Sequence, residues 1–283
     1  MLSKEDICAI IVTYNCDSSI KENIELLLPQ VKTILLVDNG SNKSSVDLLN
    51  DIYNDNIEII YNKKNMGIAY GLNQGLKYAY KNSYKLYLTM DQDSKISLGS
   101  IAKMLEVLNL NKSIISVGPN FSNILSNETY KIVDYLISSG NLTYTDKAMR
   151  VKGYTDNLFI DSVDFDFSLK LRSTGNKLAY VYNSEITHKI GEYEDANLWG
   201  KKFKITAHSP LRNYYIFRNY HYIIRKYHSH FPKFCLRYRF KVTGYFFKLL
   251  LIQNNKKEKL RMIFKGIRDG KKGIYGDYHD IYG

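Results

Sequence analysis

Short apolar runs rich in β-branched residues alternate with helical segments along the first 110 residues. The runs expected to form strands are Ile7–Thr13, Thr33–Val37, Ile57–Tyr61 and Lys85–Met90. Segments with helical spacing follow them, at Asp17–Leu28, Val46–Tyr53, Gly67–Tyr80 and Ile96–Leu108. Continuous apolar strands separated by helices are typical of a parallel sheet covered on both faces. We therefore predict an α/β fold with a mostly parallel central sheet flanked by helices.

The rhythm loosens after Pro119. Further strands are expected at Ile114–Val117, Tyr130–Ser138 and Lys177–Val181, with a helix over Asp161–Thr174. From Ser209 onward the chain is predicted to be helical. We divide it into a globular domain, residues 1–208, and a basic, aromatic helical appendage, residues 209–283.

Charge is distributed unevenly between these two parts. Residues 1–200 hold 20 Lys and Arg against 24 Asp and Glu, whereas residues 201–283 hold 20 against 4. Basic residues interleaved with Tyr and Phe suit an anionic membrane surface. A nucleic acid partner is the alternative, although the acidic body would repel a polyanion, and a solvated helical face is the plainest interpretation.

Compartment signals point to the cytoplasm. The three cysteines show no metal-binding or disulfide spacing, which fits a reducing environment. We find no signal peptide and no apolar run near the roughly 20 residues that span a bilayer. The expected location is cytoplasmic.

Two carboxylates, Asp91 and Asp93, follow the strand that ends at Met90. In an open α/β sheet, ligands bind beyond the carboxyl ends of the strands. Two hard oxygen ligands at that edge suit a divalent cation that carries a diphosphate. The chain has no GxGxxG after its first strand and no GxxxxGK[ST], which argues against a dinucleotide cofactor and P-loop chemistry.

Polar groups able to bind a base, a ribose or a phosphate follow the other strands, in Thr13-Tyr14-Asn15, Asp38-Asn39-Gly40-Ser41 and Asn65–Gly75. Asp38 alone would equally suit a turn or a helix cap. The spacing of Gly67, Gly71 and Gly75 serves either close helix packing or approach to a ligand.

A second acidic cluster contains Asp161, Asp164 and Asp166, and the first two are expected to share a helix face. Acids in a first helical turn are stabilised by the macrodipole, but one of them could also act as a general base. His188 follows a strand and is either structural or a metal ligand with Asp93, since imidazole suits Mn²⁺ better than Mg²⁺.

Together these segments resemble the inverting glycosyltransferases of family 2, which have the GT-A fold. The matching residues are Ile11-Val-Thr-Tyr-Asn15, Val37-Asp-Asn-Gly-Ser41, Asn65-Met-Gly67 with Asn73-Gln-Gly75, Asp91-Gln-Asp93, Val163-Asp-Phe-Asp166 and His188-Lys-Ile-Gly191. Within the family the chain is similar to bacterial rhamnosyltransferases of surface-polysaccharide synthesis, through Ser138-Ser-Gly140, Phe159–Asp164, His188–Glu192, Ser209–Tyr215 with Arg218-Asn219, and Gly266–Gly270.

The resemblance implies a role for each matching position. Asp164 would be the catalytic base, with Asp166 the second choice, and Asp93 and His188 would hold Mn²⁺ or Mg²⁺, to which Asp91 could also contribute. The donor would be bound by Thr13, Tyr14, Asn15, Asp38, Asn39, Asn65, Gly67, Asn73, Asp91 and Gln92. Two positions depart from the family: Val163 replaces an acid, and Lys170 stands where Arg is common, which weakens a bidentate phosphate contact there.

The implied reaction is transfer of L-rhamnose from dTDP-β-L-rhamnose to a hydroxyl of a lipid-linked glycan, in capsule, O-antigen or cell-wall synthesis at the inner face of the cell membrane. Residues 1–120 would hold the nucleotide sugar and residues 121–208 the acceptor. The alternatives are a family 2 transferase using a UDP-hexose or UDP-galactofuranose, and a nucleotide- or nucleic-acid-binding protein.

Overall fold

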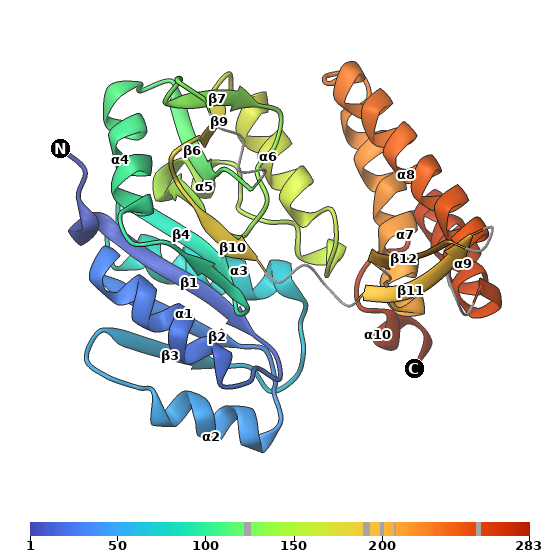
Figure 1. The fold of residues 1–283 in the computed structure, drawn as a ribbon, viewed down its shortest axis with the longest axis horizontal. Coiled ribbons are helices and arrows are strands. Elements are labelled where there is room, and N and C mark those ends of the chain that lie inside the picture. The colour runs from blue at the N-terminus through green and yellow to red at the C-terminus, as the bar shows by residue number, and fades with distance from the viewer. Residues whose placement is uncertain (122–125, 189–192, 199–200, 207, 253–255) are drawn as a thin grey trace. The chain divides into compact units, whose positions relative to one another are not determined.

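The computed structural model describes residues 1–121, 126–188, 193–198, 201–206, 208–252 and 256–283. The described residues group into two compact units (Figure 1). The first contains Met1–Asp156 and Val163–Lys189, and the second contains Asn157–Ser162 and Ile190–Gly283. The functional division predicted at residue 208 stays a prediction.

The first unit is built on an eight-stranded sheet in the order β3-β2-β1-β4-β8-β6-β9-β7. Strands β3, β2, β1 and β4 are mutually parallel, β8 and β7 run antiparallel to their neighbours, and β6 pairs in parallel with β9. The predicted α/β fold with a mostly parallel sheet is confirmed. The strands are β1 (Ile7–Thr13), β2 (Thr33–Asp38), β3 (Ile57–Tyr61), β4 (Leu86–Asp91), β6 (Ile114–Pro119), β7 (Tyr130–Val133), β8 (Asn141–Tyr144) and β9 (Lys177–Val181).

Helices cover both faces of this sheet. Successive side chains of a strand point to opposite faces, and every residue of β1 is buried, so both faces of that strand are covered. Ile7, Ala9 and Ile11 of β1 belong to one apolar core with buried residues of the helices on that face. Ile10 and Val12 point to the opposite face, toward the helix that contains Gly71 and Gly75. The helices of this unit are α1 (Ser19–Leu27), α2 (Lys43–Asp51), α3 (Ile68–Lys81), α4 (Ser100–Leu110), α5 (Thr145–Arg150) and α6 (Val163–Ser173).

The glycines of α3 serve close packing. A Cβ on Gly75 would lie 2.4 Å from Cγ2 of Ile10, and one on Gly71 would lie 2.8 Å from Cγ1 of Val12. Both contacts are shorter than side chains tolerate, so the helix can approach β1 only because these positions lack a side chain. Gly67 instead precedes the helix with a φ of 85°, a backbone conformation that favours glycine.

Three segments differ from the sequence-based prediction. The residues after Asp93 form a short strand, β5 (Ser94–Ile96), and α4 begins only at Ser100. The predicted strand Tyr130–Ser138 ends at Val133, and β8 and α5 were not predicted. Helix α6 begins at Val163 rather than Asp161, since Asp161 and Ser162 have φ values of 62° and 61°, outside the helical region.

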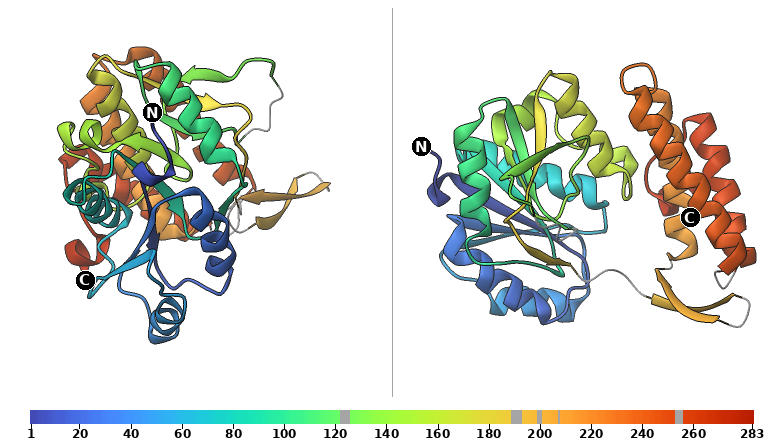
Figure 2. Two further views of the ribbon diagram at one scale, coloured as in Figure 1. Left: turned by 90° about the vertical axis from the view of Figure 1, so that its left-hand side faces the viewer. Right: turned by 45° about the horizontal axis from the view of Figure 1, so that its top comes forward.

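The second unit is dominated by helices that lie side by side (Figure 2). They are α7 (Pro210–Tyr227), α8 (Pro232–Ile252), α9 (Lys256–Lys272) and the short α10 (Tyr278–Tyr282). An antiparallel hairpin of β11 (Tyr193–Leu198) and β12 (Lys201–Thr206) precedes them and was not predicted. Within the described residues, no helix combines the length and the apolar character needed to cross a membrane.

Candidate active site

The loops that follow β1, β2 and β4 are joined by hydrogen bonds at the carboxyl edge of the sheet. The backbone N–H of Tyr14 donates to Oε1 of Gln92 at 2.9 Å. The N–H of Asn15 donates to the hydroxyl of Ser41 at 2.8 Å, and the Asn15 side chain accepts from the N–H of Asn42 at 2.9 Å. Three predicted donor-binding segments are therefore brought together, as expected for strands that end at one edge.

Asp38 is buried, and its carboxylate organises the loop that follows it. One oxygen accepts the N–H groups of Gly40 and Ser41, both at 3.1 Å, and the other accepts the hydroxyl of Thr13 at 3.3 Å. This is the turn role that sequence reasoning kept as an alternative. Each carboxylate oxygen has about two acceptor sites, so the Thr13-bonded oxygen can also accept from a ligand.

Asn39 ties the loop after β2 to the loop after β3. Its amide donates to Oδ1 of Asn65 at 3.0 Å and to the carbonyl of Gly67 at 3.1 Å. Its own carbonyl accepts the N–H of Met66 at 3.0 Å. These three bonds connect Asn39 to Asn65 and to the backbone of Met66 and Gly67, and support the conformation of Gly67 at the start of α3.

Asn73 does not join these loops. Its amide pairs with the backbone of Tyr154 in both directions, at 2.8 and 2.9 Å, and also donates to Asp156 at 2.6 Å. These bonds fasten α3 to the segment after α5. These bonds give Asn73 a structural role in the first unit, and the donor-binding role expected for it stays a prediction.

A pocket of about 470 Å³ opens beside the acidic loop and is lined by Asn15, Asp17, Gln92, Asp93, Lys95 and Thr187, among others. Lys95 and Thr187 were not singled out from the sequence. Lys95 is held by an ion pair with Glu22 of α1. A pocket with carboxylate, amide, hydroxyl and ammonium groups can bind a charged, hydroxyl-bearing ligand through several kinds of polar contact.

Strand pairing places the backbone of His188 next to the acidic loop. This residue ends β10 (Ile186–His188), which pairs antiparallel with β5 in a register that sets His188 opposite Ser94. Ser94 follows Asp93 directly, and Thr187 lines the same pocket as Asp93. The side chain of His188 and the predicted Lys189–Glu192 element lie outside the described residues.

Of the candidate metal ligands, the structure describes the side chains of Asp91 and Asp93. Among the described side chains, no group of three or more His, Cys, Asp or Glu residues could enclose a metal ion. Cations of the Mg²⁺ type are commonly held by one or two carboxylates, with substrate phosphates completing the shell. Asp93 on the pocket wall supplies such a carboxylate, and β10 brings the backbone of His188 beside it.

The three aspartates of the second cluster occupy different environments. Asp166 is fully buried, accepts the hydroxyl of Thr155 at 2.6 Å and pairs with Lys170 at 3.3 Å. Asp164 is half-buried at the start of α6 and accepts the N–H of Phe165 at 2.9 Å. Asp166 is buried and paired with a lysine, which suits a structural role. Asp164 is partly exposed and can therefore meet a substrate.

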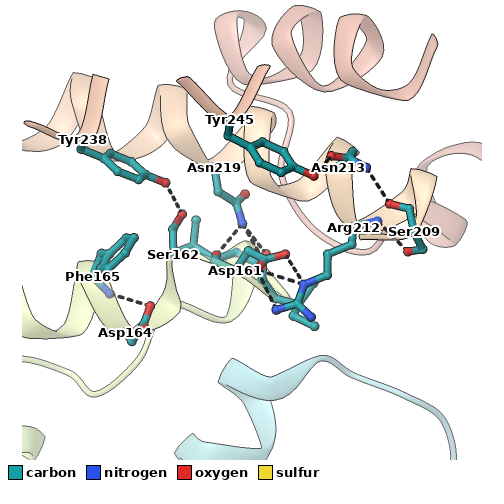
Figure 3. Close-up of polar contacts among 12 residues, drawn as sticks. Asp161, Ser162, Asp164, Phe165, Ser209, Arg212, Asn213, Asn219, Tyr238 and Tyr245 are labelled. Atoms are coloured by element: carbon teal, nitrogen blue, oxygen red, sulfur yellow. Dashed lines mark hydrogen bonds and ion pairs between the residues drawn. The ribbon is translucent and has the colours of Figure 1, made fainter. Parts of the chain in front are cut away.

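Asp161 does not share a helix face with Asp164, which corrects the sequence-based expectation. It belongs to the second unit, where its carboxylate pairs with Arg212 of α7 at 3.3 Å (Figure 3). Burial raises the pKa of Asp161, and the charge of Arg212 opposes that shift. The left-handed backbone at Asp161 breaks the helix pattern that the sequence suggested.

Helix α6 is linked to the carboxyl end of β4 through residues 136–139. The hydroxyl of Ser168 on α6 accepts the N–H of Leu136 at 3.1 Å, and the hydroxyl of Ser139 accepts the N–H of Asp91 at 3.4 Å. Tyr154 also stacks on Phe167, with ring centroids 4.2 Å apart, and bonds Tyr87 of β4 through its hydroxyl at 3.1 Å. Residues 136–139 and Tyr154 therefore link the helix that carries Asp164 to the strand that ends with Asp91.

Solved structures with the same arrangement of sheet and helices are glycosyltransferases of the GT-A class. The protein superposes on Staphylococcus aureus TarS 1-349 in complex with UDP-GlcNAc with a TM-score of 0.65, at 16% identity, over 95% of this chain and 81% of that one. On GalNAc-T7 with UDP, GalNAc and Mn²⁺ the TM-score is 0.63, at 14% identity, over 97% of this chain and 57% of that one. The fold of this chain is therefore that of the GT-A class.

Residues 8–162 match the model of glycosyl transferase family 2. The chain is also 28% identical to the dTDP-rhamnosyl transferase RfbF of Shigella flexneri, over 96% of this chain and 97% of that protein. The chain belongs to glycosyl transferase family 2. It is an enzyme that uses a nucleotide sugar as its donor.

Proposed function

We propose that the enzyme transfers L-rhamnose from dTDP-β-L-rhamnose to a hydroxyl of a glycan acceptor, with inversion at the anomeric carbon. The observation that carries the proposal is the likeness to a dTDP-rhamnosyl transferase along nearly the whole of both chains. The edge of the sheet supports it, since three strand-end loops offer amide, hydroxyl and carboxylate groups there.

In this proposal the donor's nucleoside lies against Thr13, Tyr14, Asn15 and Asp38. The diphosphate lies against the backbone near Gly67. Asn39 and Asn65 support the conformation of that loop through their hydrogen bonds. Gln92, fixed by the N–H of Tyr14, orients the acidic loop. Rigid loops of this kind reduce the ordering that donor binding would otherwise require.

Asp93 and His188 would hold a divalent Mn²⁺ or Mg²⁺ ion, to which Asp91 could also contribute. The bound ion would neutralise the diphosphate as it departs. The protein's own part is to hold Asp93 on the pocket wall and to fix β10 beside the loop through pairing with β5.

Asp164 is the proposed base. It would take the proton of the acceptor hydroxyl as that oxygen attacks the anomeric carbon from the face opposite the departing diphosphate. The C1–O bond to the diphosphate breaks as the new glycosidic bond forms, so one displacement inverts the configuration without an enzyme nucleophile. Burial and the ion pair with Lys170 make Asp166 a poorer candidate.

The acceptor is proposed to be lipid-linked, with the enzyme associated peripherally with the inner face of a bacterial membrane. The supporting observation is the charge of residues 201–283, which hold 20 Lys and Arg against 4 Asp and Glu. Such a surface is attracted to anionic lipid headgroups.

The test of the donor is release of dTDP from dTDP-β-L-rhamnose in the presence of Mn²⁺. It is compared with release of UDP from UDP-glucose, UDP-galactose and UDP-galactofuranose under the same conditions. Preference for the dTDP donor supports the proposal. Preference for a UDP donor would instead indicate a family 2 transferase that uses a UDP-hexose or UDP-galactofuranose.

A further inference from the structure

Helix α8 packs with one face on the rest of the second unit. Phe234, Tyr238, Val242 and Leu249 are buried on that face. The hydroxyl of Tyr238 bonds that of Ser162 at 2.8 Å (Figure 3). The orientation of α8 about its own axis is fixed by these contacts, so the opposite face is fixed as well.

The opposite face carries a line of large apolar side chains. Leu236, Phe240, Phe247 and Leu251 are 54%, 71%, 57% and 63% exposed. At 3.6 residues per turn they fall within an arc roughly 60° wide and extend along about 22 Å of the helix. Single exposed apolar residues are ordinary, but four large ones gathered on one helix face mark an interaction surface.

Cations border this line. Arg237, Lys241 and Lys248 lie on one side of it by helical spacing and Arg239 on the other, and all four are exposed. Lys233 precedes the line at the start of the helix, and none of the 21 residues of α8 is acidic. A narrow apolar strip between basic borders complements a bilayer surface, where apolar side chains enter the acyl boundary and cations stay among anionic headgroups.

We propose that α8 is the membrane-docking helix of this enzyme and lies along an anionic bilayer with Leu236, Phe240, Phe247 and Leu251 inserted. The inference rests on the membrane association proposed above and assigns it to one helix face. Nucleic acid fits less well, because the aliphatic side chains of Leu236 and Leu251 cannot stack on bases as aromatic ones do.

The experiment is co-sedimentation of the full-length protein with vesicles of phosphatidylcholine containing either 30% or no phosphatidylglycerol. The test variant is Phe240→Ser with Phe247→Ser. The matched control is Phe264→Ser, which removes an equally exposed phenylalanine, 60% accessible, from α9. Circular dichroism and release of nucleotide from a soluble donor verify that each variant is folded and active.

We expect the wild type to bind anionic vesicles at least about tenfold more tightly than neutral ones, and the double variant to lose at least about tenfold of that affinity. Phe264→Ser should stay within about twofold of the wild type. Arg239→Gln with Lys248→Gln should weaken binding to anionic vesicles alone.

Equal losses from the double variant and the control would overturn the assignment to α8. No vesicle binding by an active wild type would overturn the membrane association but not the glycosyltransferase reaction. A wild-type dimer in solution that the double variant dissociates, without vesicle binding, would identify the strip as a contact between copies.

Discussion

His188 lies opposite Ser94 in an antiparallel backbone register, although the two residues come from distant parts of the chain. Asp93 immediately precedes Ser94, and Thr187 shares its pocket. Strand pairing thus brings the backbone of His188 beside the residue that follows Asp93. This is the relationship on which the proposed metal site depends.

Replacing either residue should weaken metal binding. We expect Asp93→Asn and His188→Ala each to raise the Mn²⁺ concentration for half-maximal activity by about tenfold or more, since loss of a direct ligand removes at least 1.4 kcal/mol. The measurement is a Mn²⁺ titration of donor turnover, with calorimetry of Mn²⁺ binding in the presence of dTDP. Asp17→Asn is the control, because Asp17 lines the same pocket. The Asn side chain can still accept the hydrogen bond that the N–H of Ser19 donates to Asp17. An unchanged titration in Asp93→Asn, or an equal shift in the control, would contradict the site.

Asp164→Asn should lower activity without lowering stability, whereas Asp166→Asn should lower stability. Loss of the base should lower kcat by roughly 100- to 10,000-fold and leave the melting temperature near that of the wild type. Asp166→Asn leaves the Lys170 ammonium without its buried carboxylate, so it should cost about 3 kcal/mol of stability. Steady-state kinetics and thermal melts of both variants separate the roles. Near-normal turnover in Asp164→Asn, with an inactive but stable Asp166→Asn, would assign the base to Asp166.

Asn219 should act as a positioning residue for the segment that precedes Asp164. Its amide donates to the carbonyls of Leu158, Ile160 and Asp161 at 2.8 to 2.9 Å. Asn219→Ala leaves these carbonyls without that donor, so we expect faster amide exchange over residues 157–162. Because Asp164 follows two residues later, kcat should fall while KM for the donor stays unchanged.

Tyr238→Phe is the matched comparison for Asn219, since it removes one hydrogen bond to the same segment, that to Ser162. It should raise exchange less than Asn219→Ala. Equal exchange in the wild type and Asn219→Ala would show that other contacts hold the segment.

The parallel part of the fold could be predicted from sequence because its signals are local. Strands such as Ile7–Thr13 are continuous apolar runs, and their order along the chain already implies where their carboxyl ends gather. Strand β5 was missed because three residues carry no periodicity, and its partner β10 lies far along the chain. Asp161 was misassigned because side-chain spacing matches a helix there, whereas a left-handed backbone and Arg212 determine its actual place.

The site was predicted in outline for the same reason. Asp38, Asn39 and Gln92 follow strand ends, so topology alone groups them. Neither the hydrogen bonds of Asn73 to Tyr154 nor the place of Lys95 and Thr187 in the pocket could be predicted, because both depend on tertiary contacts. The glycines of α3 left two interpretations open until their distances to Ile10 and Val12 favoured packing.

The proposed donor and base are tested together by the initial rate of dTDP release from dTDP-β-L-rhamnose. This rate is measured with Mn²⁺ and a lipid extract from bacteria that make rhamnose-containing surface polysaccharide. We expect this rate to exceed the rate with any UDP-hexose and to fall at least about 100-fold in Asp164→Asn. A faster rate with a UDP donor, or an undiminished rate in Asp164→Asn, would contradict it.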